Sequence, residues 1–199
     1  MTSIRVAIFA SGSGSNARRI MEYFKGHPSI HISLLISNKS DAGALQHAAE
    51  CQVPSVYIPN AAMRQGDQVL EVLNSNQIDV IVLAGFMLLV PSTLIHAYTD
   101  RIVNIHPALL PKFGGKGMYG HHVHEAVQKA DEKESGITVH LVNARYDEGP
   151  ILAQFSVPLL SDDTAEDVER KVRGLEIAHY APTIEAWLRS DWAKSKKPD

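Results

Sequence analysis

The stretch that decides the fold lies near the N-terminus, where Ile4-Arg5-Val6-Ala7-Ile8-Phe9-Ala10 runs directly into Ser11-Gly12-Ser13-Gly14-Ser15-Asn16-Ala17. The first seven residues are an apolar run typical of a buried strand, and the next seven are rich in serine and glycine. A helical pattern follows over residues 18–25. A strand, a glycine-rich turn and a helix in this order predict an α/β fold that binds an anionic ligand at the turn.

The same alternation continues along the chain. We predict further strands at 30–37, 55–58, 78–84, 101–105, 137–142 and 151–157. We predict helices at 42–51, 91–98, 122–129 and 164–188, and residues 68–74 as the end of another helix. The helix at 164–188 has candidate N-caps at 161–164. The pattern predicts a single Rossmann-like domain over residues 1–190, with helices on both faces of a twisted, mostly parallel sheet. The last two strands form an antiparallel addition, and residues 191–199 form a polar tail.

Composition limits the class of protein. The 199 residues are 45% hydrophobic and carry a formal net charge of −3, which fits a globular domain and gives no general electrostatic reason to bind nucleic acid. The single cysteine, Cys51, cannot form an intramolecular disulfide, which suits a reducing compartment. We see no targeting signal at the N-terminus and no apolar run long enough to span a membrane. We therefore expect a cytoplasmic protein.

The glycine-rich segment Gly12-Ser13-Gly14-Ser15-Asn16-Ala17 has the spacing of a dinucleotide-binding turn. A dinucleotide site also needs an acidic residue after the second strand, and this chain has Ser37-Asn38-Lys39-Ser40 there. The serine and asparagine side chains of the segment add donors to the backbone amides, which favours a compact phosphomonoester. The alternative interpretation is a tight turn without a ligand.

A second candidate site begins where the fifth predicted strand ends, at Asn104-Ile105-His106-Pro107. Asn104 and His106 lie two residues apart, so their side chains point the same way on a strand. An amide donor beside an imidazole suits a reaction in which negative charge develops on an oxygen. Ordinary turn chemistry at a strand end is the alternative.

Further candidates lie in the second half of the chain. Asp147, in the turn after the strand that carries His140, would favour the protonated form of His106 and hold a water for proton transfer, unless it only shapes the turn. The apolar loop at 84–90 could wall a flat aromatic ligand, or it could be core. Of His121, His122 and His124, the adjacent pair diverges on a helix, which leaves His121 and His124 as one possible i, i+3 pair. With no cysteine or HxxxH partner, we expect no metal site.

Several of these stretches together resemble one family. They are Ser11–Asn16, Ser37–Lys39, Leu83–Met87, Asn104–Pro111 and Asp147–Pro150, and they are similar to the folate-dependent formyltransferases, in particular to the phosphoribosylglycinamide formyltransferases. The resemblance covers nearly the whole chain. It implies transfer of a formyl group from 10-formyltetrahydrofolate to the amine of 5-phosphoribosylglycinamide, which gives formylglycinamide ribonucleotide and tetrahydrofolate in de novo purine biosynthesis.

The resemblance also implies a role for individual residues. Asn104, His106 and Asp147 match the catalytic positions of the family, and His140 matches its supporting histidine. The N-terminal half would bind the ribonucleotide through Gly12, Ser13, Gly14, Ser15 and Asn16, with Glu176 added from the last helix. The folate would be bound by Arg64, Met87, Leu88, Leu89, Val90, Asn104, Val142, Asn143, Ala144, Arg145, Tyr146 and Asp147. Leu88 stands where many members carry an arginine, and residues 112–120 form a longer, glycine-rich loop that we interpret as a flap.

The implied reaction is direct transfer without a covalent enzyme intermediate and without a metal. We expect small-molecule substrates only, with no nucleic acid or membrane partner, and either a monomer or a homodimer. A formyltetrahydrofolate hydrolase, a formyltransferase acting on tRNA or a sugar nucleotide, and a phosphate-binding module without catalysis are the alternatives. We expect none of the extra domains that usually accompany the hydrolase and the tRNA enzyme.

Overall fold

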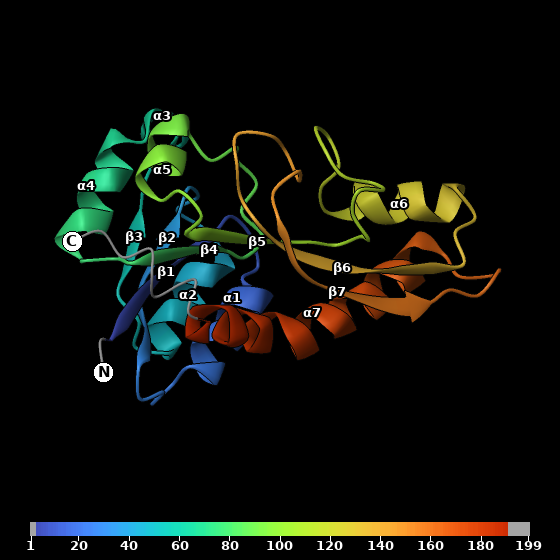
Figure 1. Ribbon diagram of the computed structural model, residues 1–199, viewed down its shortest axis with the longest axis horizontal. Coiled ribbons are helices and arrows are strands. Elements are labelled where there is room, and N and C mark those ends of the chain that lie inside the picture. The colour runs from blue at the N-terminus through green and yellow to red at the C-terminus, as the bar shows by residue number, and fades with distance from the viewer. Residues whose placement is uncertain (1–2, 191–199) are drawn as a thin grey trace. The chain divides into compact units, whose positions relative to one another are not determined.

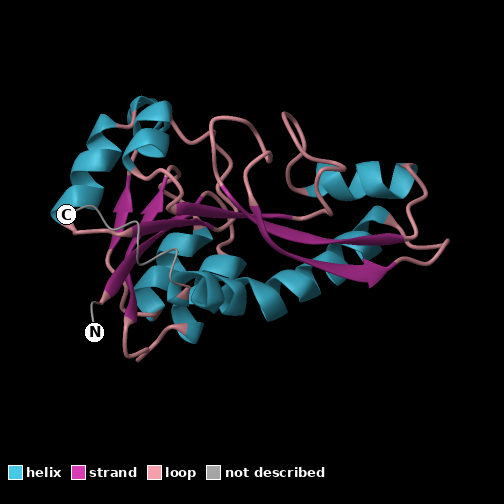
Figure 2. Cartoon of the chain, in the orientation of Figure 1, coloured by secondary structure: helices cyan, strands magenta, loops and turns pink. Residues whose placement is uncertain are grey.

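The computed structural model describes residues 3–190 of the chain (Figures 1 and 2). Its strands are β1 (Ile4–Ala10), β2 (Ile30–Ser37), β3 (Ser55–Tyr57), β4 (Val80–Leu83), β5 (Ile102–His106), β6 (Glu134–Leu141) and β7 (Ile151–Pro158). Its helices are α1 (Ser15–Tyr23), α2 (Gly43–Glu50), α3 (Asn60–Gln65), α4 (Asp67–Ser75), α5 (Ser92–Ala97), α6 (His121–Lys129) and α7 (Ala165–Arg189). The strands form one seven-stranded sheet in the order β3-β2-β1-β4-β5-β6-β7. This order, with its antiparallel C-terminal pair, confirms the predicted fold class.

The described residues divide into two compact units. Unit 1 comprises residues 3–103 and 188–190, and unit 2 comprises residues 104–187. The boundary falls inside β5, just before Asn104. The single domain over residues 1–190 stays a prediction, and the predicted polar tail at 191–199 lies outside the described residues.

Unit 1 is built on parallel strands. β1 pairs with β2 on one side and with β4 on the other, and the five residues Val6–Ala10 are completely buried. Figure 1 shows α1 and α2 on one side of these strands and α3, α4 and α5 on the other. Helices on both faces bury both sides of a parallel strand, which explains why β1 is a continuous apolar run instead of an alternating one.

Unit 2 contains the antiparallel pair β6–β7, the helix α6 and the helix α7 up to Trp187. β6 is buried from Ser135 to Leu141, and Figure 1 draws α6 and α7 on opposite sides of the pair. α7 begins with a capping box, in which the Thr164 hydroxyl accepts from the Asp167 amide at 3.2 Å and the Asp167 carboxylate accepts from the Thr164 amide at 3.0 Å. Thr164 was one of the predicted N-caps.

The largest differences from the sequence prediction lie at the starts of α1 and β6 and at α3. α1 begins at Ser15, three residues before the predicted start, because the helix continues directly from the glycine turn. β6 begins at Glu134 instead of 137. Glu134 and Ser135 are polar, so the apolar pattern does not indicate them as strand, although both pair with β7. The short helix α3 was not predicted. Gly66, at φ 87°, separates it from α4 in a left-handed conformation that favours glycine.

Candidate active site

The glycine turn of unit 1 is shaped by the backbone conformation and packing of its two glycines. Gly14 precedes α1 at φ 78°, and its carbonyl accepts the first helical hydrogen bond from the Arg18 amide at 2.8 Å. A Cβ atom on Gly14 would lie 2.5 Å from the Ala44 Cα, whereas a Cβ on Gly12 would meet nothing within 4 Å. Gly14 is therefore required by packing against α2, while the space at Gly12 is open. An anion can approach the backbone there, as predicted for a phosphate site.

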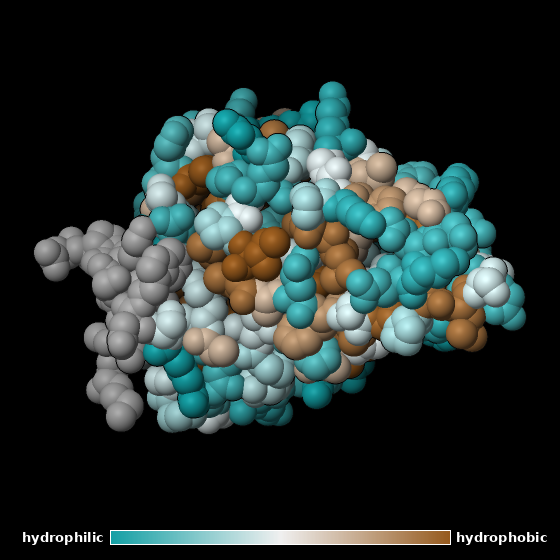
Figure 3. All heavy atoms as spheres, turned by 45° about the vertical axis from the view of Figure 1, so that its right-hand side comes forward, coloured by the Kyte–Doolittle hydropathy of each residue, from teal (hydrophilic) through white to brown (hydrophobic). Residues whose placement is uncertain are grey.

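The apolar loop after β4 also belongs to unit 1. Met87 and Leu89 are 53% and 49% exposed, and Leu88 is half-buried, whereas Val90 is buried. Figure 3 shows that some apolar side chains reach the surface among hydrophilic ones. Phe86 anchors the loop, because its ring packs edge to face on the buried Phe9 ring with centroids 5.4 Å apart. The predicted alternative, ordinary core, therefore holds for Val90 but not for Met87 or Leu89.

In unit 2, the structure brings together four of the predicted residues: Asn104, His106, His140 and Asp147. The Asn104 Nδ2 lies 3.2 Å from the His140 Nε2. The His140 Nδ1 lies 2.9 Å from the Leu141 carbonyl oxygen, which can only accept, so Nδ1 carries the proton and Nε2 accepts from Asn104. His140 thereby orients the amide of Asn104 and leaves its second N–H free to donate.

His106 is held from two sides. Its Nε2 lies 2.7 Å from the Phe113 carbonyl oxygen, so Nε2–H donates to that oxygen. Its Nδ1 lies 3.6 Å from the Asp147 Oδ2, and the Asp147 Oδ1 lies 3.6 Å from the His140 Nε2. The Asp147 carboxylate therefore faces both imidazoles at a distance that is long for a direct hydrogen bond.

Burial and Asp147 act on these histidines in opposite directions. His106 and His140 are 3% and 2% exposed, and burial lowers the pKa of His106 below its ordinary value although Asp147 raises it. Burial likewise lowers the pKa of His140, against the raising effects of the Leu141 carbonyl and Asp147. Asp147 therefore has the effect on His106 that the sequence predicts, but the effect of burial is larger. The ring donates through Nε2 in either charge state.

The turn that carries Asp147 is shaped by its neighbours. Asp147 has φ 55°, a left-handed conformation that aspartate tolerates, and its Oδ2 accepts from the Gly115 amide at 2.9 Å. A Cβ atom on Gly149 would lie 1.7 Å from the Leu141 carbonyl oxygen, so only glycine fits where this turn returns against β6. The loop at 113–115 thus contacts both His106, through Phe113, and Asp147, through Gly115.

The chain that follows His106 is fixed by one hydroxyl. The Thr138 Oγ1 donates to the Ala108 carbonyl at 2.7 Å and accepts from the Leu110 amide at 3.0 Å. The Gln154 Nε2 donates to the Leu110 carbonyl at 2.8 Å and also lies 2.9 Å from the Thr138 Oγ1. β6 and β7 thereby hold the segment that places Phe113 against His106.

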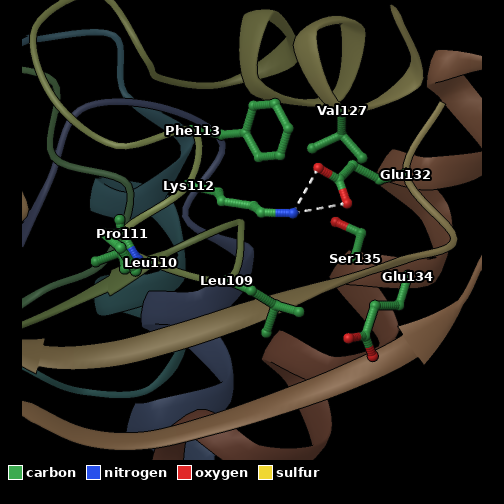
Figure 4. A pocket seen from close by; sticks show the side chains of 9 residues that line it. All are labelled: Leu109, Leu110, Pro111, Lys112, Phe113, Val127, Glu132, Glu134 and Ser135. Atoms are coloured by element: carbon green, nitrogen blue, oxygen red, sulfur yellow. Dashed lines mark hydrogen bonds and ion pairs between the residues drawn. The ribbon is translucent and has the colours of Figure 1, made fainter. Parts of the chain in front are cut away.

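A pocket of about 230 Å³ borders the same segment (Figure 4). It is lined by Leu109, Leu110, Pro111, Lys112, Phe113, Val127, Glu132, Glu134 and Ser135. The Lys112 Nζ lies 2.8 and 3.1 Å from the two Glu132 carboxylate oxygens inside it, as Figure 4 shows. None of the four clustered polar residues lines this pocket, so it is separate from the candidate active site.

The remaining predicted residues lie at the surface or elsewhere in their units. Arg64 on α3 is exposed, as are Ala144, Arg145 and Tyr146, while Val142 and Asn143 are half-buried in the turn before Asp147. The Asn143 Oδ1 accepts from the Arg145 amide at 2.8 Å, which orders the turn. Glu176 is half-buried on α7 in unit 2, and it raises the pKa of Tyr180 in addition to the larger effect of burial.

The three histidines of α6 lie in different surroundings. His121 is paired with Glu169, with 2.8 Å between the Nδ1 and the carboxylate oxygen, and this hydrogen bond raises its pKa. His122 is exposed, and His124 is buried with a pKa lowered by desolvation. Among residues 3–190, no group of three or more histidines, cysteines or carboxylates is arranged to hold a metal ion, and no helix there is long and apolar enough to cross a membrane.

Comparison with known proteins identifies the family. The model of the formyl transferase family matches residues 4–184. A chloroplastic phosphoribosylglycinamide formyltransferase of Arabidopsis thaliana is 39% identical over 188 residues, which are 92% of this chain, and this chain spans 64% of that protein's length. A phosphoribosylglycinamide formyltransferase of Bacillus subtilis is 35% identical and is covered to 94% of its length by 92% of this chain.

A solved structure agrees with both relatives. The crystal structure of phosphoribosylglycinamide formyltransferase from Bacillus halodurans superposes with a TM-score of 0.85 at 38% identity, over 94% of this chain and 96% of that one. The family match spans almost all of the described residues, including both clusters of candidate residues. The chain therefore belongs to the formyl transferase family.

Proposed function

We propose that this protein transfers the formyl group of 10-formyltetrahydrofolate to the amine of 5-phosphoribosylglycinamide, in de novo purine biosynthesis. The observation that carries the proposal is the polar cluster in unit 2, in which His106 and His140 are buried and Asn104 and Asp147 are half-buried. It combines two N–H donors, on Asn104 and His106, with one carboxylate, on Asp147. Formyl transfer between two nitrogens needs these groups: donors for an oxygen that becomes negative, and an acceptor for the proton of the attacking amine.

The reaction requires the amine to add to the formyl carbon while negative charge develops on the formyl oxygen. Asn104 donates its second N–H to this oxygen, because the first is used by His140. His106 donates its Nε2–H, and the formyl oxygen takes the place of the Phe113 carbonyl as the acceptor. Neither donor needs a positive charge, so the lowered pKa of His106 is compatible with this role.

Asp147 moves the proton in this proposal. Its carboxylate faces both His106 and His140 at 3.6 Å, and it is held by the Gly115 amide at 2.9 Å. A water bound at this carboxylate would take the proton from the attacking nitrogen and return it to the leaving nitrogen of the folate. As the oxygen of the substrate becomes negative, the electrostatic field at His106 also favours its protonated form.

The substrate-binding roles are part of the same proposal. The segment at 12–16 binds the phosphate of the ribonucleotide through backbone amides and hydroxyls, and Glu176 binds the rest of that substrate. Arg64, Met87–Val90 and Val142–Asp147 bind the folate, with the exposed side chains of Met87 and Leu89 against its flat ring. No step in this account uses a metal.

The experiment that tests the proposal mixes purified protein with 10-formyltetrahydrofolate and follows the absorbance change on loss of the formyl group, with and without 5-phosphoribosylglycinamide. We expect turnover only when the ribonucleotide is present, and one formylated ribonucleotide for each folate consumed. Equal turnover without an acceptor would show that the protein is a hydrolase and would contradict the proposal. No turnover with either mixture, together with retained phosphate binding, would show that the protein is a binding module without catalysis.

We further propose that the protein acts in the cytoplasm on these small molecules alone, as a monomer or a homodimer. The support is the composition: one cysteine and a formal charge of only −3 favour a reducing compartment and give no reason to bind nucleic acid or a membrane surface. Sedimentation of the purified protein with and without both substrates tests the assembly, and a species larger than a dimer would contradict it.

A further inference from the structure

One buried serine in unit 1 contacts two loops at once. Ser11 is 1% exposed and lies directly before the glycine turn. Its amide donates to the Gly85 carbonyl at 3.1 Å, and its hydroxyl oxygen accepts from the Met87 amide at 2.9 Å. Ser11, which directly precedes the loop at 12–16, thus forms two hydrogen bonds with the start of the loop at 85–90.

The direction of these hydrogen bonds is fixed. Because an amide N–H can only donate, the Ser11 oxygen accepts from Met87 and has its single proton left for the Asn38 Oδ1, 2.6 Å away. The Asn38 Nδ2 then donates to the Asn60 Oδ1 at 2.8 Å. Asn38 is 4% exposed, so water does not readily replace either bond.

The glycine turn is equally restricted on its other side. The Gly12 carbonyl accepts from the Ala44 amide at 3.3 Å, and Gly14 packs against the Cα of Ala44. The segment therefore has α2 on one side and Ser11 at its start. A ligand that fixes the backbone of Gly12 also fixes Ser11, and Ser11 in turn fixes the amide of Met87.

We infer that Ser11 and Asn38 are positioning residues that couple the phosphate loop at 12–16 to the loop at 85–90. This inference rests on the proposed function, in which the first loop binds the ribonucleotide and the second contacts the folate. Binding of the ribonucleotide restrains Ser11 and so preorganises Met87, which raises the affinity for the folate. By thermodynamic linkage, the folate raises the affinity for the ribonucleotide by the same factor.

The experiment measures the dissociation constant of tetrahydrofolate by calorimetry, with and without saturating 5-phosphoribosylglycinamide. For the unaltered protein we expect the ribonucleotide to tighten binding by about fivefold or more, the lower end of typical coupling. Ser11→Ala removes the acceptor of the Met87 amide, so we expect the ratio of the two constants to fall to near one. Ser33→Ala is the matched control, because the Ser33 hydroxyl donates to the His31 carbonyl of its own strand at 3.3 Å and bonds to neither loop among the described residues.

A second variant separates coupling from general damage. Asn38→Leu leaves the Ser11 hydroxyl but removes its acceptor, so we expect a coupling ratio between those of the unaltered protein and Ser11→Ala. In the variants, KM for the folate should rise more than kcat falls, because neither residue contacts the reacting atoms. A role in stability alone would lower the melting temperature and leave the ratio of dissociation constants unchanged.

The unaltered protein gives an independent readout if Ser11→Ala does not fold. Inorganic phosphate, which occupies only the loop at 12–16, should shift the amide resonance of Met87 and slow its hydrogen exchange. The inference is overturned by an unchanged Met87 amide, by a coupling ratio of one in the unaltered protein, or by full coupling in folded Ser11→Ala. If coupling is found but no formyl group is transferred, the proposed function fails and the coupling stands. If a formyl group is transferred but the two substrates bind independently, the proposed function stands and the coupling fails.

Discussion

The two units of the chain build their candidate sites from different material. In unit 1 the segment at 12–16 presents backbone amides, and the tight packing of Gly14 against Ala44 fixes its shape. In unit 2 the site consists of the side chains of Asn104, His106 and Asp147, each oriented by a hydrogen bond with another residue. A backbone site recognises charge and shape, whereas buried side chains can donate, accept and transfer protons.

This difference determines how each site should fail. A substitution in the glycine turn changes whether the backbone can adopt its conformation, so stability and binding are lost first. A substitution in the side-chain cluster removes one chemical group from a scaffold held by β6 and β7, so the rate is lost first. The two kinds of substitution should therefore differ in whether the rate or the stability falls first.

Asn104→Ala removes a donor to the developing oxyanion and should lower kcat by about 10² to 10³. Binding of both substrates should change much less, because the interaction forms mainly in the transition state. Steady-state kinetics with separate binding measurements check this. A loss of the same size in the affinities, with kcat retained, would place Asn104 in binding instead of chemistry.

Gly14→Ala should lower the free energy of unfolding by about 1–3 kcal/mol, since the added Cβ meets the Ala44 Cα at 2.5 Å and φ is 78°. Gly12→Ala is the matched variant, because its Cβ meets nothing within 4 Å. It should leave stability nearly unchanged but weaken the binding of inorganic phosphate. Urea unfolding and phosphate titration check the pair. Equal stability losses in the two variants would contradict the packing argument.

His140→Leu should lower kcat by roughly 2- to 10-fold, the effect of losing a hydrogen bond worth about 0.5–1.5 kcal/mol. The leucine cannot accept from the Asn104 amide, so the orientation of the donor is lost while the donor itself remains. A double variant with Asn104→Ala should therefore be no slower than Asn104→Ala alone. Multiplied losses would show that His140 acts independently of Asn104.

Stability should decrease as the pH falls below about 6.5. Burial lowers the pKa values of His106, His140 and His124 in the folded protein, so the unfolded chain binds more protons in this range. Protonation then favours unfolding, and the stabilising effect of the neutral rings, present above pH 6.5, is lost as the pH approaches the lowered values. Urea unfolding between pH 5 and pH 8 checks the sign. A stability that rises towards pH 5 would contradict it.

The sequence predicted the fold class and indicated two groups of candidate residues, because both depend on local patterns. Apolar runs marked the strands, and the spacing of Asn104 and His106 placed their side chains on one face of β5. The separate helix α3 was missed, because its end depends on the conformation of Gly66. The effect of burial on the pKa of His106 was also missed, since burial is a tertiary property. Nor could the sequence indicate the Phe113 carbonyl as a partner of His106, or the bond between Ser11 and Met87, because these involve backbone groups that every residue carries.

The catalytic role of the cluster is decided by single-turnover formyl transfer with His106→Ala, Asp147→Asn and the double variant, each folded and saturated with both substrates. We expect the rate to fall by about 10² to 10³ in His106→Ala. We also expect the fold loss in rate of the double variant to be smaller than the product of the two single losses, because the two side chains act on the same proton and charge. A rate equal to that of the unaltered protein in folded His106→Ala would contradict the assignment of this cluster to catalysis.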